Sequence, residues 1–511
     1  MKMARWALLL MTAWLLAGVI GCERNRERAA LPPSAGEPPL PVSFMNIAWR
    51  TAKTDTDFQR ELERRLNVTF TPSFIPRSDY EQKLKVALTT GQIPDLVQLL
   101  PDGPQHYTSV QVKAIEEGMF ADLTPYIRSA SFARDYPNLA AYPANVWDKL
   151  TYKGKIYGIP RYLEPETFDG FYMRRDLLEA AGLAIPETVD ELADTLIRLS
   201  SPPDRYGLEI GGAKALDGAG LKSISVAFTG VMNWGVEDKG NFTYQNFMPE
   251  YKQYLLWLKK LYDAKAIDPE FALGADVEAY KKGEAAAKAH RWHSYAAAAD
   301  PRMTTVPFAA HVGPAADSVL IPPVRGPRGW AVDANIGFYT QTVIRAKGNE
   351  GQIPRYLKLI DRLAAPEYRE LVTHGVEGVH HYVKDGRKHN LPRFEDDCVA
   401  CWSWFQHEAR DIMADTLQRG LKRPEEFTRT IETIYARYKE MNLTNPHYSL
   451  VSDTLLTRWG NFTKDLNDNR VKVVMGIMTM DEWDGYVNAL VASDIYKDIQ
   501  QELKVVWEQS R

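Results

Sequence analysis

Strands and helices alternate along residues 42–100, and this alternation limits the fold more than any other feature of the chain. Strands are expected at residues 42–49, 68–70 and 93–100. Between them lie two apolar stripes with helical spacing, formed by Phe58, Leu62 and Leu66 and by Tyr80, Leu84 and Leu88. Strands that are separated by helices pair in parallel, so the pattern predicts an α/β fold with a parallel sheet.

A second α/β unit is expected to begin near residue 160. A short strand at 170–173 is followed by a helix that opens with the capping box Thr188-Val-Asp-Glu191. The C-terminal third is expected to be mainly helical, since an apolar stripe runs from Phe427 through Ile431 to Ile434. About 470 residues follow the N-terminal region, and a single core rarely grows beyond about 250–300 residues, so at least two lobes are expected.

The first 22 residues have the pattern of an export signal. Two positive residues precede an almost wholly apolar run at 6–19, which leads into Val19-Ile-Gly-Cys22. The run is shorter than the ~20 residues that cross a bilayer, and plain secretion or an uncleaved anchor are the alternatives. The last four residues resemble the lipobox of bacterial lipoproteins, which implies removal of residues 1–21 and lipidation of Cys22. Residues 22–41 are rich in proline and are expected to form a flexible tether.

The composition argues against several kinds of partner. The net charge is −4 at pH 7, so there is no electrostatic case for binding nucleic acid. No further run of about 18 apolar residues follows the signal, so the remaining chain is expected to be water-soluble. The chain contains 13 Trp and 25 Tyr residues. Aromatic side chains usually pack in cores, but such a number also fits carbohydrate recognition, because sugar rings stack on indole and phenol rings.

Beyond Cys22 the chain has one pair of cysteines, Cys398 and Cys401. In an oxidising compartment the pair can form a disulfide, and a redox or metal-binding role is the alternative. Asp396 and Asp397 directly precede the pair, and their negative charges would raise a thiol pKa rather than lower it. A structural role is therefore expected.

Short segments spread over nearly the whole chain together resemble a known family. They include Leu66-Asn-Val-Thr-Phe70, Thr90-Gly-Gln-Ile-Pro-Asp-Leu96, Lys155-Ile-Tyr-Gly-Ile-Pro160, Tyr172-Met-Arg-Arg-Asp-Leu177, Lys282-Gly-Glu-Ala-Ala286 and Gly375-Val-Glu-Gly378. In this order and spacing they are similar to the extracellular solute-binding proteins, family 1, that serve ABC transporters. Within that family, the chain most resembles the large lipoprotein receptors of Gram-positive bacteria that are thought to bind oligosaccharides.

The resemblance implies a two-lobed, type II periplasmic-binding-protein-like α/β fold, with discontinuous lobes, a hinge and a ligand cleft. Lobe one would comprise residues 42–160 and 318–378, and lobe two residues 161–317 and 379–511. The implied protein is a monomeric receptor, lipid-anchored at the extracellular face of the cell membrane. It would bind an oligosaccharide and deliver it to the permease subunits of an ABC transporter, without enzyme activity or a cofactor.

A calcium site is not expected. Some sugar-binding relatives carry an acidic calcium loop after the capping-box helix, but residues 200–208 hold one acidic residue and lack the spacing of such a loop. No other metal site is expected.

Candidate ligand residues come from the resemblance and from strand ends. The resemblance places Trp292 in the cleft. Trp49 ends the first expected strand, and ligands of α/β sheets bind at the carboxyl ends of parallel strands. Tyr162 and Glu164 follow the first hinge strand. Further candidates are the loop tryptophans Trp234, Trp330 and Trp404, and the charged residues Asp95 and Arg291, which can bind sugar hydroxyls. For each residue the alternative is an ordinary role in packing, capping or an ion pair.

An enzyme is the main alternative to a receptor. A glycosidase needs two carboxylates about 5–9.5 Å apart, and no local motif indicates such a pair. Glu377, between His374 and His380, lacks the spacing of the known zinc motifs. A receptor for peptides or other solutes, or a sensor partner without a transport role, is the second alternative, because one fold serves many functions.

Overall fold

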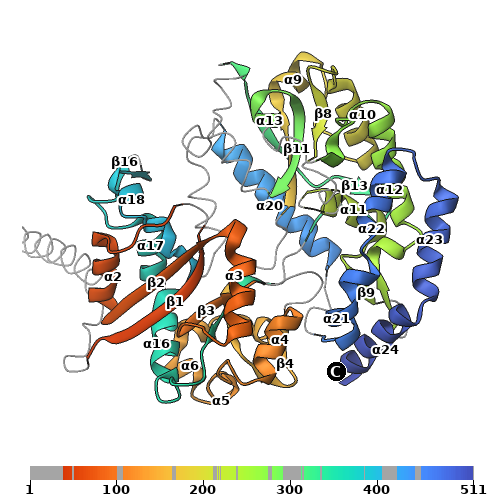
Figure 1. Cartoon of the computed structure of the whole chain (residues 1–511). Helices are drawn as coiled ribbons and strands as arrows, with labels where there is room; N and C mark the ends of the chain where they lie inside the picture. The colour runs from red at the N-terminus through yellow and green to blue at the C-terminus, as the bar shows by residue number, and fades with distance from the viewer. Residues whose placement is uncertain are drawn as a thin grey trace, which may run out of the picture.

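The chain forms two α/β lobes, each built around its own sheet (Figure 1). This architecture comes from a computed structural model. It describes residues 38–48, 51–100, 107–163, 169–210, 216, 218, 220–236, 240–273, 279–291, 312–313, 316–333, 337–384, 386–405, 423–443 and 450–509. The α/β fold with two discontinuous lobes, expected from the sequence, is confirmed.

Lobe one contains a five-stranded sheet with the order β2-β1-β3-β15-β6. Its strands are β1 (Leu40–Ala48), β2 (Val68–Pro76), β3 (Leu96–Leu99), β6 (Gly158–Tyr162) and β15 (Phe338–Ile344). Strand β1 pairs in parallel with β2 and β3, whereas β15 runs antiparallel to β3 and β6. The predicted parallel sheet is therefore present. Strand β1 begins at Leu40, two residues before the expected start of the first strand at residue 42.

Alternating side chains of β1 divide the core of lobe one into two layers. Val42 and Phe44 point to the layer that contains helix α2 (Asp57–Leu66) and helix α16 (Ile353–Ala364). Met45 and Ile47 point to the layer that contains α3 (Arg77–Thr90) and α4 (Ser109–Glu116). The remaining elements before β6 are α5 (Thr124–Ile127), α6 (Phe132–Asp135), α7 (Pro137–Ala140), α8 (Ala144–Lys149), β4 (Thr151–Tyr152) and β5 (Lys155–Ile156).

Lobe two contains a four-stranded sheet with the order β12-β7-β11-β8. Its strands are β7 (Asp169–Arg174), β8 (Tyr206–Glu209), β11 (Ala285–Arg291) and β12 (Ser318–Ile321). The helices of this part are α9 (Arg175–Ala180), α10 (Val189–Leu199), α11 (Leu221–Thr229), α12 (Tyr251–Asp263) and α13 (Ala279–Lys282). Helix α10 begins with the predicted capping box of Thr188 and Glu191. Short elements complete the part, namely β9 (Trp234–Val236), β10 (Phe242–Tyr244), η3 (Gln245–Phe247), η4 (Phe271–Leu273), β13 (Arg325–Gly326) and β14 (Gly329–Trp330).

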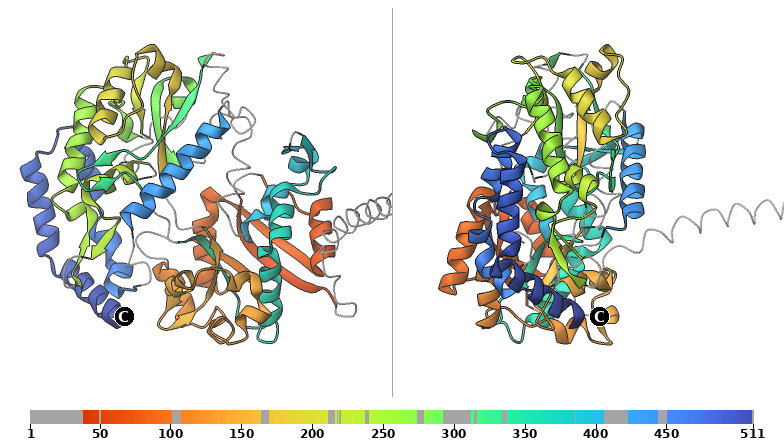
Figure 2. Two further views of the ribbon diagram at one scale, coloured as in Figure 1. Left: turned by 180° about the vertical axis from the view of Figure 1, so that it is seen from behind. Right: turned by 90° about the vertical axis from the view of Figure 1, so that its right-hand side faces the viewer.

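Five C-terminal helices belong to lobe two and confirm the helical C-terminal third. They are α20 (Pro424–Met441), α21 (Asp453–Phe462), α22 (Leu466–Val474), α23 (Met480–Ala492) and α24 (Asp494–Gln509). Helix α20 packs on β12 and β14, and the apolar residues of the last four helices join the main core of lobe two. In Figure 2 the dark blue helices α23 and α24 follow the outer side of that lobe.

Two of the expected lobe boundaries are wrong. Residues 318–333 were expected in lobe one, but β12 pairs with β7 of the second sheet. Residues 379–405 were expected in lobe two, yet Phe394 and Trp402 pack in the core of lobe one. This segment contains β16 (His381–Lys384), β17 (Arg387–Asn390), α18 (Arg393–Asp396) and η5 (Val399–Phe405), and it follows α17 (Pro366–His374). Apolar periodicity shows that a segment is buried, but not which lobe buries it.

The chain passes from one lobe to the other three times, between residues 163 and 169, 333 and 337, and 405 and 423. Just before the third crossing, Cys398 and Cys401 form a disulfide. The neighbouring Trp402 packs against Phe44 and Phe70 of the sheet. Both cysteines are buried in the core of lobe one, which agrees with the structural role expected for the pair.

The N-terminal predictions fall on residues 1–37, which lie outside the described residues together with Cys22. Within the described ranges, no helix combines the length and the apolar character that crossing a membrane requires.

Candidate functional site

One edge of the lobe-one sheet lies beside the crossings. Leu99 of β3 pairs with Gln341 of β15, and Tyr162 of β6 pairs with Phe338 of β15. The carboxyl end of β3 therefore lies beside the start of β15, which is where the chain enters lobe one again after the second crossing. Because β1 and β2 are parallel to β3, their carboxyl ends reach the same edge.

The corresponding edge of the lobe-two sheet lies beside the same crossings. Strand β7 starts after the first crossing, and Arg291 of β11 pairs with its first residue, Asp169. Ile321, the last residue of β12, pairs with Phe171. The carboxyl ends of β11 and β12 thus lie where β7 begins. We call these two sheet edges, one from each lobe, the crossing edges.

Among the described residues that were predicted to bind ligand, Tyr162 and the backbone of Arg291 lie at the crossing edges. Trp49, Glu164 and Trp292 lie outside the described residues, but their neighbours Ala48, Leu163 and Arg291 lie at these edges. The side chains of Arg291 and Trp404 also lie outside the described set. For these residues ligand contact remains a prediction.

Tyr162 lies at the lobe-one crossing edge but is buried, with 7% of its surface exposed. Its ring stacks on Tyr142, with ring centroids 5.1 Å apart. On the preceding residue, the guanidinium of Arg161 lies 6.0 Å from the centre of the Tyr339 ring. Burial lowers the pKa of Arg161 to about 10, so the group is still charged at neutral pH. This edge thus carries an enclosed positive charge.

Asp95 does not belong to the site. It lies at the amino end of β3, opposite the crossing edge, and its carboxylate accepts hydrogen bonds from the backbone and hydroxyl of Ser43 and from Asn349. Arg345 donates to the same carboxylate at 2.6 Å. Burial acts to raise the pKa of Asp95, but these hydrogen bonds outweigh it and hold the pKa below its usual value. The prediction of ligand contact is wrong, because this carboxylate is committed to joining β1, β3 and β15.

Trp234 is not a loop residue and does not face a ligand. It opens strand β9 and is fully buried. Its ring stacks on Tyr496 and contacts Trp459, with centroids 5.5 and 5.4 Å away. No face of the ring is left for a sugar, so this prediction is also wrong. Asn233 has a positive φ of 57°, as expected of a bend, but Gly235 belongs to β9 and long-range packing covers the tryptophan.

Trp330 lies half-buried in the hairpin of β13 and β14, near the second crossing. The guanidinium carbon of Arg437, on α20, lies 3.8 Å from the centre of its ring, and that of Arg325 lies 5.8 Å from it. The backbone N–H of Trp330 donates to the sulfur of Met441 at 3.2 Å. The preceding Gly329 has φ +130°, a backbone conformation that favours glycine, and a Cβ atom there would force the Met441 side chain, whose sulfur would be 2.3 Å away, to move.

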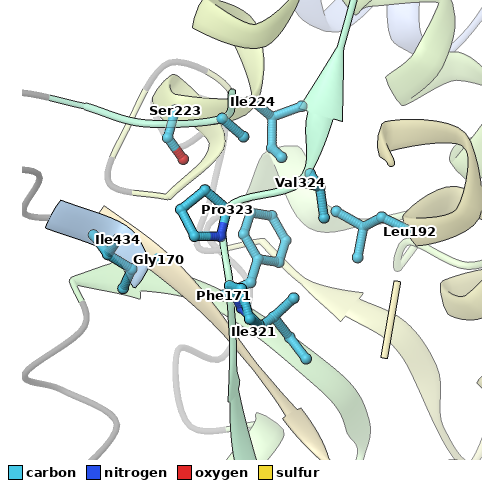
Figure 3. A pocket seen from close by; sticks show the side chains of 11 residues that line it. Gly170, Phe171, Leu192, Ser223, Ile224, Ile321, Pro323, Val324 and Ile434 are labelled. Atoms are coloured by element: carbon cyan, nitrogen blue, oxygen red, sulfur yellow. The ribbon is translucent and has the colours of Figure 1, made fainter. Parts of the chain in front are cut away.

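The hairpin is fixed on a tightly packed floor beside the crossing edge of lobe two. Figure 3 shows Phe171, Ile224, Ile321, Pro323 and Ile434 converging on a cavity of about 10 Å³. This volume is close to the space that a single water needs, so the cavity cannot hold a sugar. These apolar side chains instead form a packed surface next to the β13–β14 hairpin.

The positive partners of Trp330 were missed in the sequence. Arg437 lies 107 positions away along the chain, and Arg325 is one of many arginines in turns, so neither carries a local signal. Among the described residues, no group of three or more His, Cys, Asp or Glu side chains is placed to hold a metal ion.

Comparison with known proteins agrees with this architecture. Residues 56–336 match the family model of bacterial extracellular solute-binding proteins. The chain belongs to this family. The resemblance found in the sequence is thereby confirmed, and the family description is that of binding proteins rather than enzymes.

Two proteins of Bacillus subtilis (strain 168) are similar to this solute-binding protein over most of their length. It is 24% identical to the polygalacturonan/rhamnogalacturonan-binding protein YtcQ, over 99% of both chains. It is 20% identical to the lipoprotein LipO, over 92% of both chains. Its fold is similar to that of the alginate-binding protein AlgQ2 without calcium ion, with a TM-score of 0.67 and 16% identity, over 94% of this chain and 99% of that one.

Proposed function

We propose that the chain is an extracellular receptor that binds an oligosaccharide between its lobes and delivers it unaltered to the permease of an ABC transporter. The observation that carries the proposal is the position of the crossing edges. Carboxyl strand ends from both sheets lie beside the same crossings, and ligands of α/β sheets bind at such ends.

The chemistry of these edges supports a sugar. The ring of Tyr339 and the guanidinium of Arg161 lie at the crossing edge of lobe one, and sugar rings stack on aromatic faces while hydroxyls bond to polar groups. The names of YtcQ and AlgQ2 refer to polysaccharides, which supports the same class of ligand.

Three crossings between two lobes favour a hinge motion. Closure would exclude water from the ligand, and a ligand that contacts both lobes stabilises the closed state. The permease then needs to recognise only this closed state. We propose that the receptor acts as a monomer.

A lipid anchor at Cys22 would hold the receptor at the extracellular face of the cell membrane. The export pattern that ends at this cysteine supports the anchor, and LipO is named a lipoprotein. Replacing Cys22 by Ser should release the protein from the membrane fraction into the medium, whereas a release of less than half would contradict the anchor.

The receptor function is tested by a thermal-shift panel of oligosaccharides, peptides and amino acids, followed by calorimetry. A ligand at 100 times its Kd should raise the free energy of unfolding by about 2.7 kcal/mol. Mass spectrometry should recover the ligand intact, and small-angle scattering should show a smaller radius of gyration with ligand. Shortened sugar products would instead support a glycosidase, and stabilisation by peptides alone would support a different receptor.

A further inference from the structure

Two guanidinium groups share the ring of Trp330. Arg437 lies 3.8 Å and Arg325 lies 5.8 Å from the ring centre, so both are within the range of cation–π attraction. At 3.8 Å the planar guanidinium of Arg437 is in van der Waals contact with the ring. A neutral sugar therefore cannot stack on that part of the Trp330 ring without displacing an arginine. We call Arg325, Trp330 and Arg437 the arginine–tryptophan cluster.

The arginine–tryptophan cluster is held in place from both sides. The backbone N–H of Arg325 donates a hydrogen bond to the backbone oxygen of Glu187 at 2.8 Å, beside the start of α10. Trp330 is tied to Met441 at the end of α20, and the same helix carries Arg437. A guanidinium that stacks on a ring loses little further freedom when it binds a ligand, so the cluster is preorganised.

The cluster lies at the crossing edge of lobe two and is open to solvent. Helix α20 places Ile434 beside Gly170, the second residue after the first crossing, and Arg437 follows one turn later. Trp330 lies four positions before residue 334, where the second crossing begins. Arg325 is exposed, and the side chain of Arg437 keeps 37% of its surface exposed.

The cluster has an excess of positive charge. Among the described residues, Glu440 is the acid that forms an ion pair with the cluster, and its carboxylate lies 3.1 Å from Arg437. A hydrogen bond from the Trp330 side chain lowers the pKa of Glu440, with a further contribution from Arg437, so the acid is ionised at neutral pH. Two arginines and one glutamate leave one positive charge. The outward N–H groups of a guanidinium match a carboxylate with two parallel hydrogen bonds.

We propose that the oligosaccharide carries carboxylate groups and that Arg325 and Arg437, stacked on Trp330, form the subsite that binds one of them. This inference rests on the proposed receptor function. It adds the charge of the ligand and the residues that bind the charged group. Trp330 then acts as the support of the arginines rather than as a bare platform for a sugar ring.

Calorimetry with the full-length mature protein tests the inference. The probes are trimers of galacturonate, of mannuronate and of guluronate, the methyl-ester form of each, a neutral galactose trimer and a sulfated galactose trimer. At least one carboxylated trimer should bind at least 10-fold more tightly than its methyl ester, and raising the salt concentration should reduce this preference.

Three variants separate the cluster from general effects of charge. Arg437→Gln should lower the affinity for the carboxylated trimer at least 10-fold and leave the methyl ester nearly unchanged. Arg437→Lys keeps the charge but loses the planar fork, so it should recover only part of the affinity. Arg198→Gln removes an exposed arginine of α10 in the same lobe and should change neither affinity. A melting temperature within 2 °C of the wild type, on the order of the shift expected from a substitution worth less than 1 kcal/mol, shows that each variant is folded.

The outcomes distinguish the inference from the proposed function. Equal affinity for the carboxylated trimers and their esters, a preference for neutral or sulfated sugar, or an unchanged preference in Arg437→Gln would each overturn the inference while the receptor function stands. Binding of no oligosaccharide at all would overturn both.

Discussion

The carboxylate of Asp95 accepts a hydrogen bond from Nη2 of Arg345 at 2.6 Å. This pair connects the start of β3 to the end of β15, the strand that follows the second crossing. The two residues are 250 positions apart in the chain. Ser43 and Asn349 complete the hydrogen bonds of the carboxylate. The network therefore joins three strands at the end of the sheet opposite the crossing edge.

Replacing Asp95 by Asn should lower the free energy of unfolding by about 2–3 kcal/mol, because Arg345 loses its charged partner in a half-buried setting. Urea denaturation measures the change. The matched control is Asp148→Asn, which removes an acid from an exposed pair with Arg128 and should cost less than about 0.5 kcal/mol. Equal costs for the two variants would contradict the structural role of Asp95.

The contribution of Asp95 should depend on pH. The folded-state pKa of Asp95 lies below its usual value, so its stabilising effect is complete above the unfolded pKa of about 3.9 and disappears as the pH falls through the folded value. The difference in stability between the wild type and Asp95→Asn should therefore be constant from pH 7 to 5 and shrink at pH 3. A difference that grows at pH 3 would show that the pKa of Asp95 is raised, and not lowered, in the folded state.

Trp402 and Trp330 should respond differently to substitution. Trp402 is buried and touches three phenylalanine rings of the sheet, with centroids 5.1–5.8 Å away. Trp402→Ala should destabilise lobe one by about 3–5 kcal/mol, whereas Trp330→Ala should cost about 1 kcal/mol and weaken ligand binding. Chemical denaturation and calorimetry, carried out on both variants, separate the two roles. A larger loss of stability for Trp330→Ala would contradict them.

The disulfide of Cys398 and Cys401 should make a modest contribution to stability. It closes a loop of four residues, for which the loss of unfolded-state entropy corresponds to about 2 kcal/mol. The variant with both cysteines changed to Ser should be less stable by about this amount. A reducing agent should destabilise the wild type and have no effect on this variant. A thiol assay that finds two reactive thiols in the untreated folded protein would disprove the bond.

The start of helix α10 offers a test of a local signal. The Thr188 side chain accepts from the N–H of Glu191 at 3.2 Å, and the Glu191 carboxylate accepts from the N–H of Thr188 at the same distance. Thr188→Ala should lower the stability of lobe two by about 1 kcal/mol in urea denaturation, and Thr188→Ser should retain most of it. Equal losses for both variants would show that the hydroxyl is not the stabilising group.

Local patterns in the sequence were sufficient to predict many elements. The stripes of Phe58 and Tyr80 predicted α2 and α3, and the capping box at Thr188 predicted the start of α10. These signals depend on residues a few positions apart, so the sequence alone reports them.

The tertiary structure decided which distant segments meet. The residues around Trp234 indicated a loop, but the ring is covered by Tyr496, which lies 262 positions later. Strand β12 pairs with a strand of the second lobe rather than the first. The ring of Trp330 contacts Arg437, which lies on a helix that follows the third crossing. The sequence by itself determined the periodicity of burial, the caps and the turns, because these reflect local backbone and side-chain chemistry. The partner of each buried or charged group depends on long-range packing of both sheets, which no local pattern contains.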